Sequence, residues 1–182
     1  RVILRSEEVR RPGAPTWSPQ GDWIAFSNYD SEQPEENGVY MIRPDGTELT
    51  HLTTDVGDPV WSPDGEWIAF AGYSPWDMGV FLVRRDGTEK LQLPTSPEHT
   101  NERKVVSWSP DGTRLAYGYN ETIYVADADG AQVLDLAEKA GLNVAEWPAW
   151  SPRGDRIAFG GSLKDDWPDQ LAEVRRAFDF SA

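Results

Sequence analysis

Few residues in the sequence have the types and spacing that catalysis or metal binding requires. The chain has two histidines, His51 and His99, and neither belongs to a Glu-x-x-His pair or has a second histidine at metal-ligand spacing. Gly160-Gly161-Ser162 lacks the trailing glycine of a nucleophile elbow. Without a nearby histidine for a Ser–His–Asp triad, and without a Gly-rich phosphate loop, we predict that the chain is not an enzyme and holds no cofactor.

One carboxylate cluster has the pattern that opens a calcium loop. Asp127-Ala128-Asp129-Gly130 reads D-x-D-G, but no bidentate glutamate stands at the twelfth position. Two segments of similar pattern, Arg43-Pro44-Asp45-Gly46 and Arg84-Arg85-Asp86-Gly87, begin with a cation. A hairpin turn explains all three segments, whereas calcium explains one, so we predict turns and no metal site.

The composition excludes several classes of partner. With 17 Lys and Arg against 31 Asp and Glu, the net charge is −14, which argues against binding nucleic acid or an anionic membrane surface. The sequence has no apolar run long enough to insert in a bilayer. It also has no cysteine, so disulfides and thiolate chemistry are absent. Hydrophobic residues make up 38% of the chain. With glycine counted as well, the apolar share is close to that of globular proteins, which is enough for a folded core.

Four of the nine tryptophans open the same phrase. The phrase recurs at spacings of 44, 47 and 42 residues, which is the range of propeller blades and too long for most helical solenoids. The copies are WSPQGDWIAF from Trp17, WSPDGEWIAF from Trp61, WSPDGTRLAY from Trp108 and WSPRGDRIAF from Trp150. A second phrase follows three of them: VYMIRPDGTEL from Val39, VFLVRRDGTEKL from Val80 and IYVADADGAQVL from Ile123.

Each repeat predicts four short antiparallel strands. The first strand precedes Trp, and Ser-Pro-Asp-Gly makes the turn into a nearly continuous apolar second strand. The third strand follows a variable loop, and an Asp-Gly hairpin joins it to a more polar fourth. We expect the four Trp residues before Ser-Pro to lie in the core. The central alanines, Ala25, Ala69, Ala116 and Ala158, should mark close approach of neighbouring blades, and Trp23 and Trp67 should lie on blade flanks.

These phrases resemble the TolB-type β-propeller repeat, a relative of WD-type blades. The resemblance implies an all-β fold of about four TolB-like four-stranded blades. They lie near 13–53, 57–93, 104–136 and 146–164, within a propeller domain spanning 1–164. The fourth blade is incomplete, because no third strand with a D-x-D-G hairpin follows Phe159.

The C-terminal segment 165–182 departs from the repeat. Acidic residues and Pro168 at its start, and Arg175 and Arg176 near its end, predict a short amphipathic helix over 167–178. At the other terminus, Val2-Ile3-Leu4 could supply a strand to a closing blade. We expect either a small, irregularly closed ring or part of a larger one, and we favour the part. Self-association that completes a ring is a further alternative, because open blade edges invite pairing.

The loops between second and third strands share a face with the blade-to-blade connections. They collect aromatic and acidic residues in the variable segments 27–38, 71–79, 94–104 and 137–147. Variable loops on a rigid scaffold often carry binding residues, and exposed aromatic residues are common interface anchors. The predicted partner-binding residues are Tyr29, Tyr73, Trp76, Asp77, His99, Tyr119 and Trp147.

We therefore predict a non-catalytic scaffold that binds a protein or peptide, with basic partners favoured by the acidic charge. The family resemblance implies a periplasmic or secreted location. One alternative stays open, because similar repeats form the substrate-gating propeller of serine peptidases of the prolyl-oligopeptidase kind. In that alternative, the hydrolase domain lies outside these residues.

Overall fold

The computed structural model describes residue 9 and residues 11–73, 78–93, 106–119, 122–136 and 142–163. Two compact units divide the chain, residues 1–92 and residues 93–182, and they are described in turn. The predicted helix over 167–178 and the predicted strand at 2–4 lie outside the described residues.

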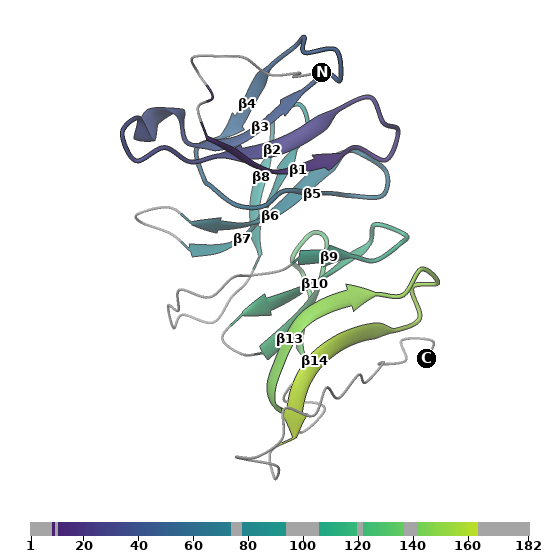
Figure 1. Ribbon diagram of the computed structural model, residues 1–182. Helices are drawn as coiled ribbons and strands as arrows, with labels where there is room; N and C mark the ends of the chain where they lie inside the picture. The colour runs from purple at the N-terminus through teal and green to yellow at the C-terminus, as the bar shows by residue number, and fades with distance from the viewer. Residues whose placement is uncertain are drawn as a thin grey trace. The chain divides into compact units, whose positions relative to one another are not determined.

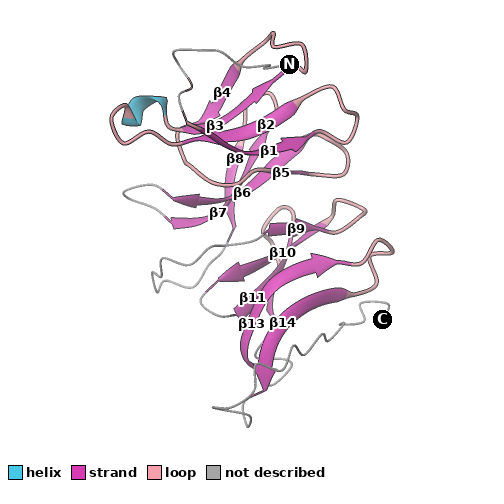
Figure 2. Ribbon diagram, viewed as in Figure 1, coloured by secondary structure: helices cyan, strands magenta, loops and turns pink. Residues whose placement is uncertain are grey.

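The first unit contains two four-stranded antiparallel sheets, each with its strands in chain order (Figure 1). The first sheet comprises β1 (Pro12–Trp17), β2 (Ile24–Asn28), β3 (Gly38–Ile42) and β4 (Thr50–Thr53). The second sheet comprises β5 (Val60–Trp61), β6 (Trp67–Tyr73), β7 (Met78–Arg84) and β8 (Lys90–Leu93), whose last residue is assigned to the second unit. A 3₁₀ turn, η1 (Pro34–Glu36), lies in the loop between β2 and β3 (Figure 2).

The second unit repeats this arrangement once and then begins it again. The third sheet comprises β9 (Val106–Trp108), β10 (Arg114–Tyr119), β11 (Thr122–Asp127) and β12 (Val133–Asp135). The fourth sheet is formed by β13 (Leu142–Trp150) and β14 (Ile157–Leu163), and it has two strands in the described part of the chain. These sheets confirm the predicted all-β class with an incomplete fourth blade.

A serine hydroxyl closes the turn between the first and second strands of each sheet. The amide of Trp67 donates to Ser62 Oγ at 2.9 Å, and the Ser62 hydroxyl donates in turn to Asp64. The third sheet repeats this pattern with Ser109 and Asp111. The glycine that follows each of these aspartates has a positive φ, 75° at Gly65 and 72° at Gly112, as the turn requires.

In the first and fourth turns a different position supplies the carboxylate. Gln20 and Arg153 occupy the place of the aspartate, two residues after the serine. The Ser18 hydroxyl instead donates to Asp22 at 2.9 Å, and the Ser151 hydroxyl donates to Asp155 at 2.7 Å. The serine therefore finds a carboxylate in all four turns, although the carboxylate comes from two places in the sequence.

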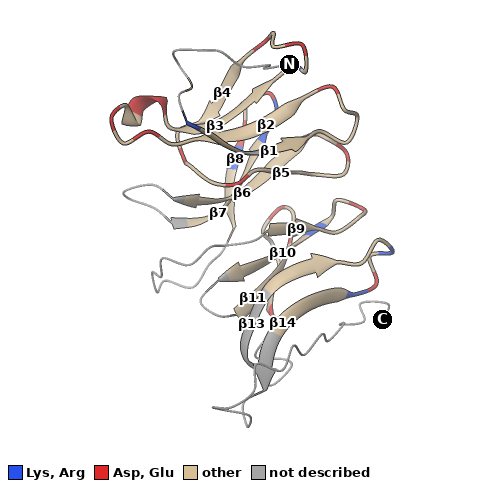
Figure 3. Ribbon diagram, viewed as in Figure 1, with Lys and Arg blue, Asp and Glu red and all other residues tan. Residues whose placement is uncertain are grey.

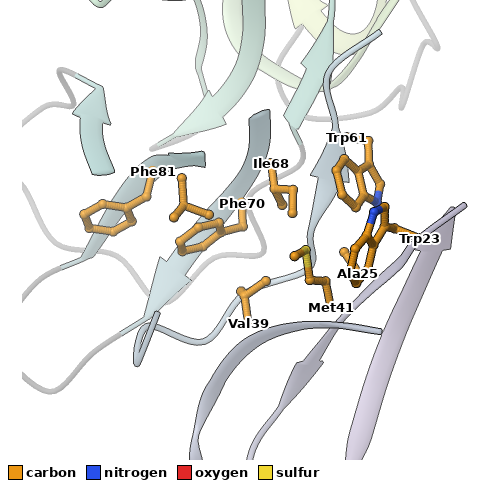
Figure 4. Close-up of a cluster of buried hydrophobic side chains, with 9 residues drawn as sticks. Trp23, Ala25, Val39, Met41, Trp61, Ile68, Phe70 and Phe81 are labelled. Atoms are coloured by element: carbon orange, nitrogen blue, oxygen red, sulfur yellow. The ribbon is translucent and has the colours of Figure 1, made fainter. Parts of the chain in front are cut away.

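Each sheet has two faces. The leading face carries the Trp that precedes Ser-Pro. The trailing face carries the central Ala of the second strand. In the first unit, the leading face of the second sheet packs on the trailing face of the first (Figure 4). The residues of this core are Trp23, Ala25, Val39, Met41, Trp61, Ile68, Phe70, Phe81 and Val83.

Trp61 makes the central contact between the two sheets of the first unit. Its side chain is 6% exposed, and its indole Nε1–H donates to the carbonyl oxygen of Thr16 at 3.3 Å. Figure 4 shows the Trp61 ring beside that of Trp23, with Ala25 close by. The flank position predicted for Trp23 is confirmed: its ring is buried in this core, and the Arg43 guanidinium lies 3.9 Å from its centroid.

The second unit builds the same contact. Trp150, Ile157 and Phe159 of the fourth sheet pack on Ala116 and Val125 of the third. The amide of Trp150 donates to the Ser107 hydroxyl at 3.1 Å. Thr16 and Ser107 both stand one residue before the Trp of their own sheet, so the two units align their first strands in the same way.

Two core predictions were wrong, one in each unit. Trp17 is 56% exposed, whereas Trp61 and Trp108 are buried as expected. The leading face of the first sheet is covered by Val9 over Ile24 and Phe26, and this cover leaves Trp17 in solvent. Ala158 is exposed on the trailing face of the fourth sheet, whereas Ala25, Ala69 and Ala116 are fully buried. The sequence repeat identifies the position within a sheet but not whether a neighbouring sheet covers it.

Truncating Trp61 should destabilise the protein far more than truncating an exposed tryptophan. Trp61→Ala leaves a cavity between two sheets, and we expect a loss of about 3–5 kcal/mol in the free energy of unfolding. Trp147→Ala removes a side chain that is 65% exposed and should cost below about 0.5 kcal/mol. Urea denaturation followed by far-UV circular dichroism measures both, and equal losses would contradict the assigned core.

The turn carboxylates should make stability depend on acid. The hydrogen bond from the Ser109 hydroxyl, together with those from Thr113, holds the pKa of Asp111 below its ordinary value. A carboxyl group whose pKa is lower in the folded state stabilises the fold above its unfolded pKa, and this contribution is lost as the pH falls through the folded pKa. Asp111→Asn should therefore lower Tm at neutral pH, and its difference from the parent protein should shrink below about pH 4.

The matched control for this experiment is Glu35→Gln, which removes an exposed carboxylate from η1. Thermal unfolding across the acid range should show little effect of this change at neutral pH. A Tm difference for Asp111→Asn that stays constant from neutral to acidic pH would show that its carboxylate does not stabilise the turn through charge.

Candidate partner-binding face

The two ends of the sheets in the first unit differ in character. At one end, the turn end, lie the Ser-Pro turns and the Asp-Gly hairpins. The Gln20 side chain there donates to the carbonyl oxygen of Asp64 at 3.0 Å, so the turns of both sheets lie together. At the other, the loop end, lie the segment between β2 and β3 and the connection from β4 to β5. The predicted partner-binding residues Tyr29 and Tyr73 belong to the loop end.

A buried amide organises the loop between β2 and β3. Asn28 is fully buried at the end of β2. Its Oδ1 accepts a hydrogen bond from the amide of Arg11 at 3.1 Å, and its Nδ2 donates to the carbonyl oxygen of Glu36 at 2.7 Å. Asn37, at the far end of the loop, accepts a hydrogen bond from the amide of Asp30. These side chains satisfy loop backbone groups that would otherwise be buried without partners.

Aromatic side chains support the same loop from the sheet. The Tyr40 hydroxyl donates to the carbonyl oxygen of Glu36 at 2.9 Å. The His51 ring stacks on Tyr40 with centroids 4.4 Å apart, and its Nε2 lies 3.1 Å from the carbonyl oxygen of Asn37. His51 is exposed at the sheet edge, and its contacts give it a structural role.

This support presents one aromatic and two acidic side chains to solvent. Tyr29 is 51% exposed, and Glu32 and Glu35 are exposed beside it in the chain. Figure 3 shows acidic residues gathered on the η1 loop. The loop is thus a fixed surface of negative charge with a projecting phenol ring, suited to a cationic or amphipathic partner.

The other predicted residues fall in three groups. Tyr73 and Tyr119 end β6 and β10, where their backbones pair with Met78 and Thr122, and their side chains lie outside the description. Trp147 is strongly exposed in the second unit. Trp76, Asp77 and His99 lie outside the described residues.

The position expected for Trp147 was wrong in one respect. We predicted a variable connection over 137–147, but β13 already begins at Leu142. Trp147 lies within this strand at a register shift between Glu146 and Ala149, and its φ is 53°. A β-bulge of this kind re-aims a side chain, which accounts for an exposed indole in the middle of a strand.

The structure also contains a pocket that the sequence did not indicate. It has a volume of about 270 Å³ at the turn end of the first unit, and its lining residues are Asp22, Trp23, Met41, Arg43, Arg85 and Asp86. Arg43 is held at 3.2 Å from Asp22 and 3.5 Å from Glu48, and it also covers Trp23. Since these charges and the ring already contact one another, we assign the pocket no ligand. One feature of the sequence could have pointed to this pocket: the position of Trp23 is Trp in two of the repeats and Arg in the other two.

The D-x-D-G segment forms the predicted hairpin. The Asp129 carboxylate accepts a hydrogen bond from the amide of Ala131 at 2.9 Å, and Gly130 has a φ of 76°. Asp127 lies 3.4 Å from Arg114 Nε. Among the residues that the structure describes, no cluster of three or more His, Asp or Glu side chains could hold a metal ion.

The same part of the chain contains no helix long and apolar enough to cross a membrane. No protein-family model and no curated protein matches the sequence.

Solved structures do match the fold. TolB from Acinetobacter baumannii is similar over 90% of this chain, with a TM-score of 0.66 and 18% identity. A chain of the nidogen/laminin complex is similar over 97%, with a TM-score of 0.64 and 13% identity. Puromycin hydrolase is similar over 88%, with a TM-score of 0.63 and 16% identity.

The chain spans only part of each of these proteins: 40% of the TolB chain, 66% of the chain from the nidogen/laminin complex and 26% of puromycin hydrolase. Other similar structures are enzymes, among them oligogalacturonate lyases and a gluconolactonase. The matches therefore include TolB as well as several enzymes, and they identify the architecture rather than an activity. Together with the repeated antiparallel sheets, they show that the chain has a TolB-like β-propeller fold.

Proposed function

We propose that this chain is a non-catalytic propeller scaffold that binds a basic protein or peptide through the loop end of its sheets. The observation that carries this proposal is the loop between β2 and β3. Buried Asn28 and Asn37 hold it in place, and it presents half-exposed Tyr29 with two carboxylates. A loop that is already ordered loses little conformational entropy on binding.

The similar structures support protein recognition without deciding it. One of them is a complex between two proteins, nidogen and laminin, and another is TolB. The resemblance to TolB-type repeats favours a periplasmic or extracellular location, which we include in the proposal. A net charge of −14 would speed encounter with a basic partner and reject acidic ones.

A cationic amphipathic peptide tests the proposal directly. A fluorescein-labelled peptide of alternating Lys and Leu should bind, and its affinity should fall as the salt concentration rises. Tyr29→Ala should weaken binding by about fivefold or more, because an interface anchor contributes over ~1 kcal/mol. Glu32→Gln combined with Glu35→Gln should reduce the dependence on salt. Fluorescence anisotropy measures the parent protein and both variants.

Two controls separate the loop from charge in general. Glu89→Gln removes one exposed carboxylate from the turn end of the first unit, and it should change binding less than either loop glutamate. A peptide of alternating Glu and Leu should not bind. The proposal would be overturned if the affinity for the Lys/Leu peptide changed neither with salt nor with Tyr29→Ala, in variants whose circular dichroism is unchanged.

A second candidate function rests on the likeness to puromycin hydrolase. In this alternative, the sheets gate substrate entry to a serine peptidase domain of the prolyl-oligopeptidase kind encoded with them. The polypeptide encoded by the full gene distinguishes the two functions. A Gly-x-Ser-x-Gly nucleophile motif following the repeats, with hydrolysis of a peptidyl p-nitroanilide by the full product, would favour the peptidase.

A further inference from the structure

The sequence contains one Asn-Gly pair, Asn37-Gly38, and this pair closes the loop between β2 and β3. Asparagine followed by glycine is the dipeptide most prone to deamidation, because glycine has no side chain to hinder attack by its own backbone nitrogen. In that reaction, the glycine nitrogen attacks the Cγ atom of the asparagine side chain. The other four asparagines of the chain precede larger residues, so Asn37 is the one most open to this chemistry.

The loop uses the side chain of Asn37 and leaves no room for one at position 38. Asn37 is 8% exposed, and its Oδ1 accepts a hydrogen bond from the amide of Asp30. Gly38 begins β3 and pairs with the last residue of β2. A Cβ atom at Gly38 would collide with the backbone carbonyl of Thr53 and with the ring of His51. The contacts that order the loop therefore place an asparagine directly before a glycine.

The conformation of the folded loop opposes the reaction. The succinimide ring that the attack forms contains Cβ and Cγ of Asn37 and the nitrogen of Gly38, so Cβ and this nitrogen must be nearly eclipsed about the Cα–C bond. The ψ of Asn37 is 148°, which is far from that geometry. Rotating the chain there would pull Gly38 from its pairing with β2 and break the hydrogen bond from Asp30. The ring can therefore close only after the loop opens.

We propose that Asn37 is a site of spontaneous deamidation that is controlled by the opening of this loop. In the open loop, the Gly38 nitrogen forms a bond to Cγ of Asn37, and the bond from Cγ to Nδ2 breaks. The amide proton of Gly38 leaves with Nδ2 as ammonia. Water then adds to either carbonyl of the succinimide and opens the ring. The product at position 37 is aspartate or isoaspartate, with an added negative charge.

Either product disturbs the interactions that order the loop. Isoaspartate routes the main chain through Cβ, and the added carbon atom shifts Gly38 out of register with β2. Aspartate places a charge at a buried position next to Asp30, an acidic residue that is 3% exposed, and buried like charges are unfavourable. The loop should therefore stay open once it is modified and no longer present Tyr29. This effect on binding rests on the proposed function, whereas the modification does not.

Mass spectrometry compares the reaction with and without the fold. The parent protein and a synthetic peptide of residues 33–42 are incubated in mildly alkaline buffer, and peptide mapping follows the mass gain at Asn37. The peptide gives the rate of the unprotected sequence. The parent protein should react at least about tenfold more slowly, because the reactive open form is a minor population. Equal rates in the protein and the peptide would overturn the proposal.

Variants that loosen the loop should accelerate the reaction. Asn28→Ala removes two hydrogen bonds that hold the loop and should raise the deamidation rate of Asn37 by about fivefold or more. Tyr40→Phe removes another such bond and carries the same expectation if circular dichroism shows that Asn28→Ala does not fold. The matched control, Ser62→Ala, removes hydrogen bonds from a turn of the second sheet and should leave the rate unchanged. A rate that did not rise in the loop variants, or that rose equally in Ser62→Ala, would overturn the proposal.

The modified protein reports the effect on the loop. Its added charge separates it from the parent protein by anion exchange. A glutamate-specific protease should cut it faster at Glu35 or Glu36, since an open loop exposes its backbone, and equal cleavage of the two forms would overturn the proposal. Fluorescence anisotropy with the Lys/Leu peptide should show weaker binding. Faster cleavage with unchanged affinity for that peptide would instead overturn the proposed function and leave the modification standing.

Discussion

The packing of a tryptophan over the central alanine strand of the preceding sheet joins the sheets within each unit. The indole supplies a large apolar area, and the alanine lets the two backbones approach closely enough for that area to be buried. In the first unit, the Trp61 Nε1–H also donates to Thr16, so its one polar group is satisfied as the ring leaves water. This contact is directional, because the two faces differ. Within each unit, a leading face therefore meets a trailing face.

The turns between first and second strands show how such a repeat tolerates sequence change. The hydroxyl of each Ser-Pro serine donates to a carboxylate and accepts from the amide that starts the next strand. In the second sheet the carboxylate comes from Asp64, two residues after the serine. In the first sheet it comes from Asp22, four residues after the serine. A position-by-position comparison of the repeats would read Gln20 in place of Asp64 as the loss of this hydrogen bond. The physical interaction is kept, because an oxygen acceptor reaches the same hydroxyl from either side.

The strands, turns and hairpins could be predicted from the sequence because their signals are local. Ser-Pro-Asp-Gly and Asp-Gly dictate backbone conformation within a few residues, and the apolar runs between them are short and regular. The exposure of Trp17 could not be predicted this way, since it depends on whether another sheet lies against it. The fixed conformation of the loop that carries Tyr29 could not be predicted from the sequence either. It rests on Asn28 bonding a carbonyl eight residues later, and a buried asparagine at a strand end carries no sequence signature.

The two ends of the sheets use their acidic residues differently, and this difference favours recognition at the loop end. The turn-end carboxylates of Asp45, Asp86 and Asp111 accept hydrogen bonds from their own turns, which lowers their pKa values. A partner that bound these carboxylates would have to replace the hydrogen bonds that they accept from their own turns. Glu32 and Glu35 instead extend from a loop whose order comes from buried amides. Because their charges are not needed to hold that loop, a partner can bind them without a loss of fold stability.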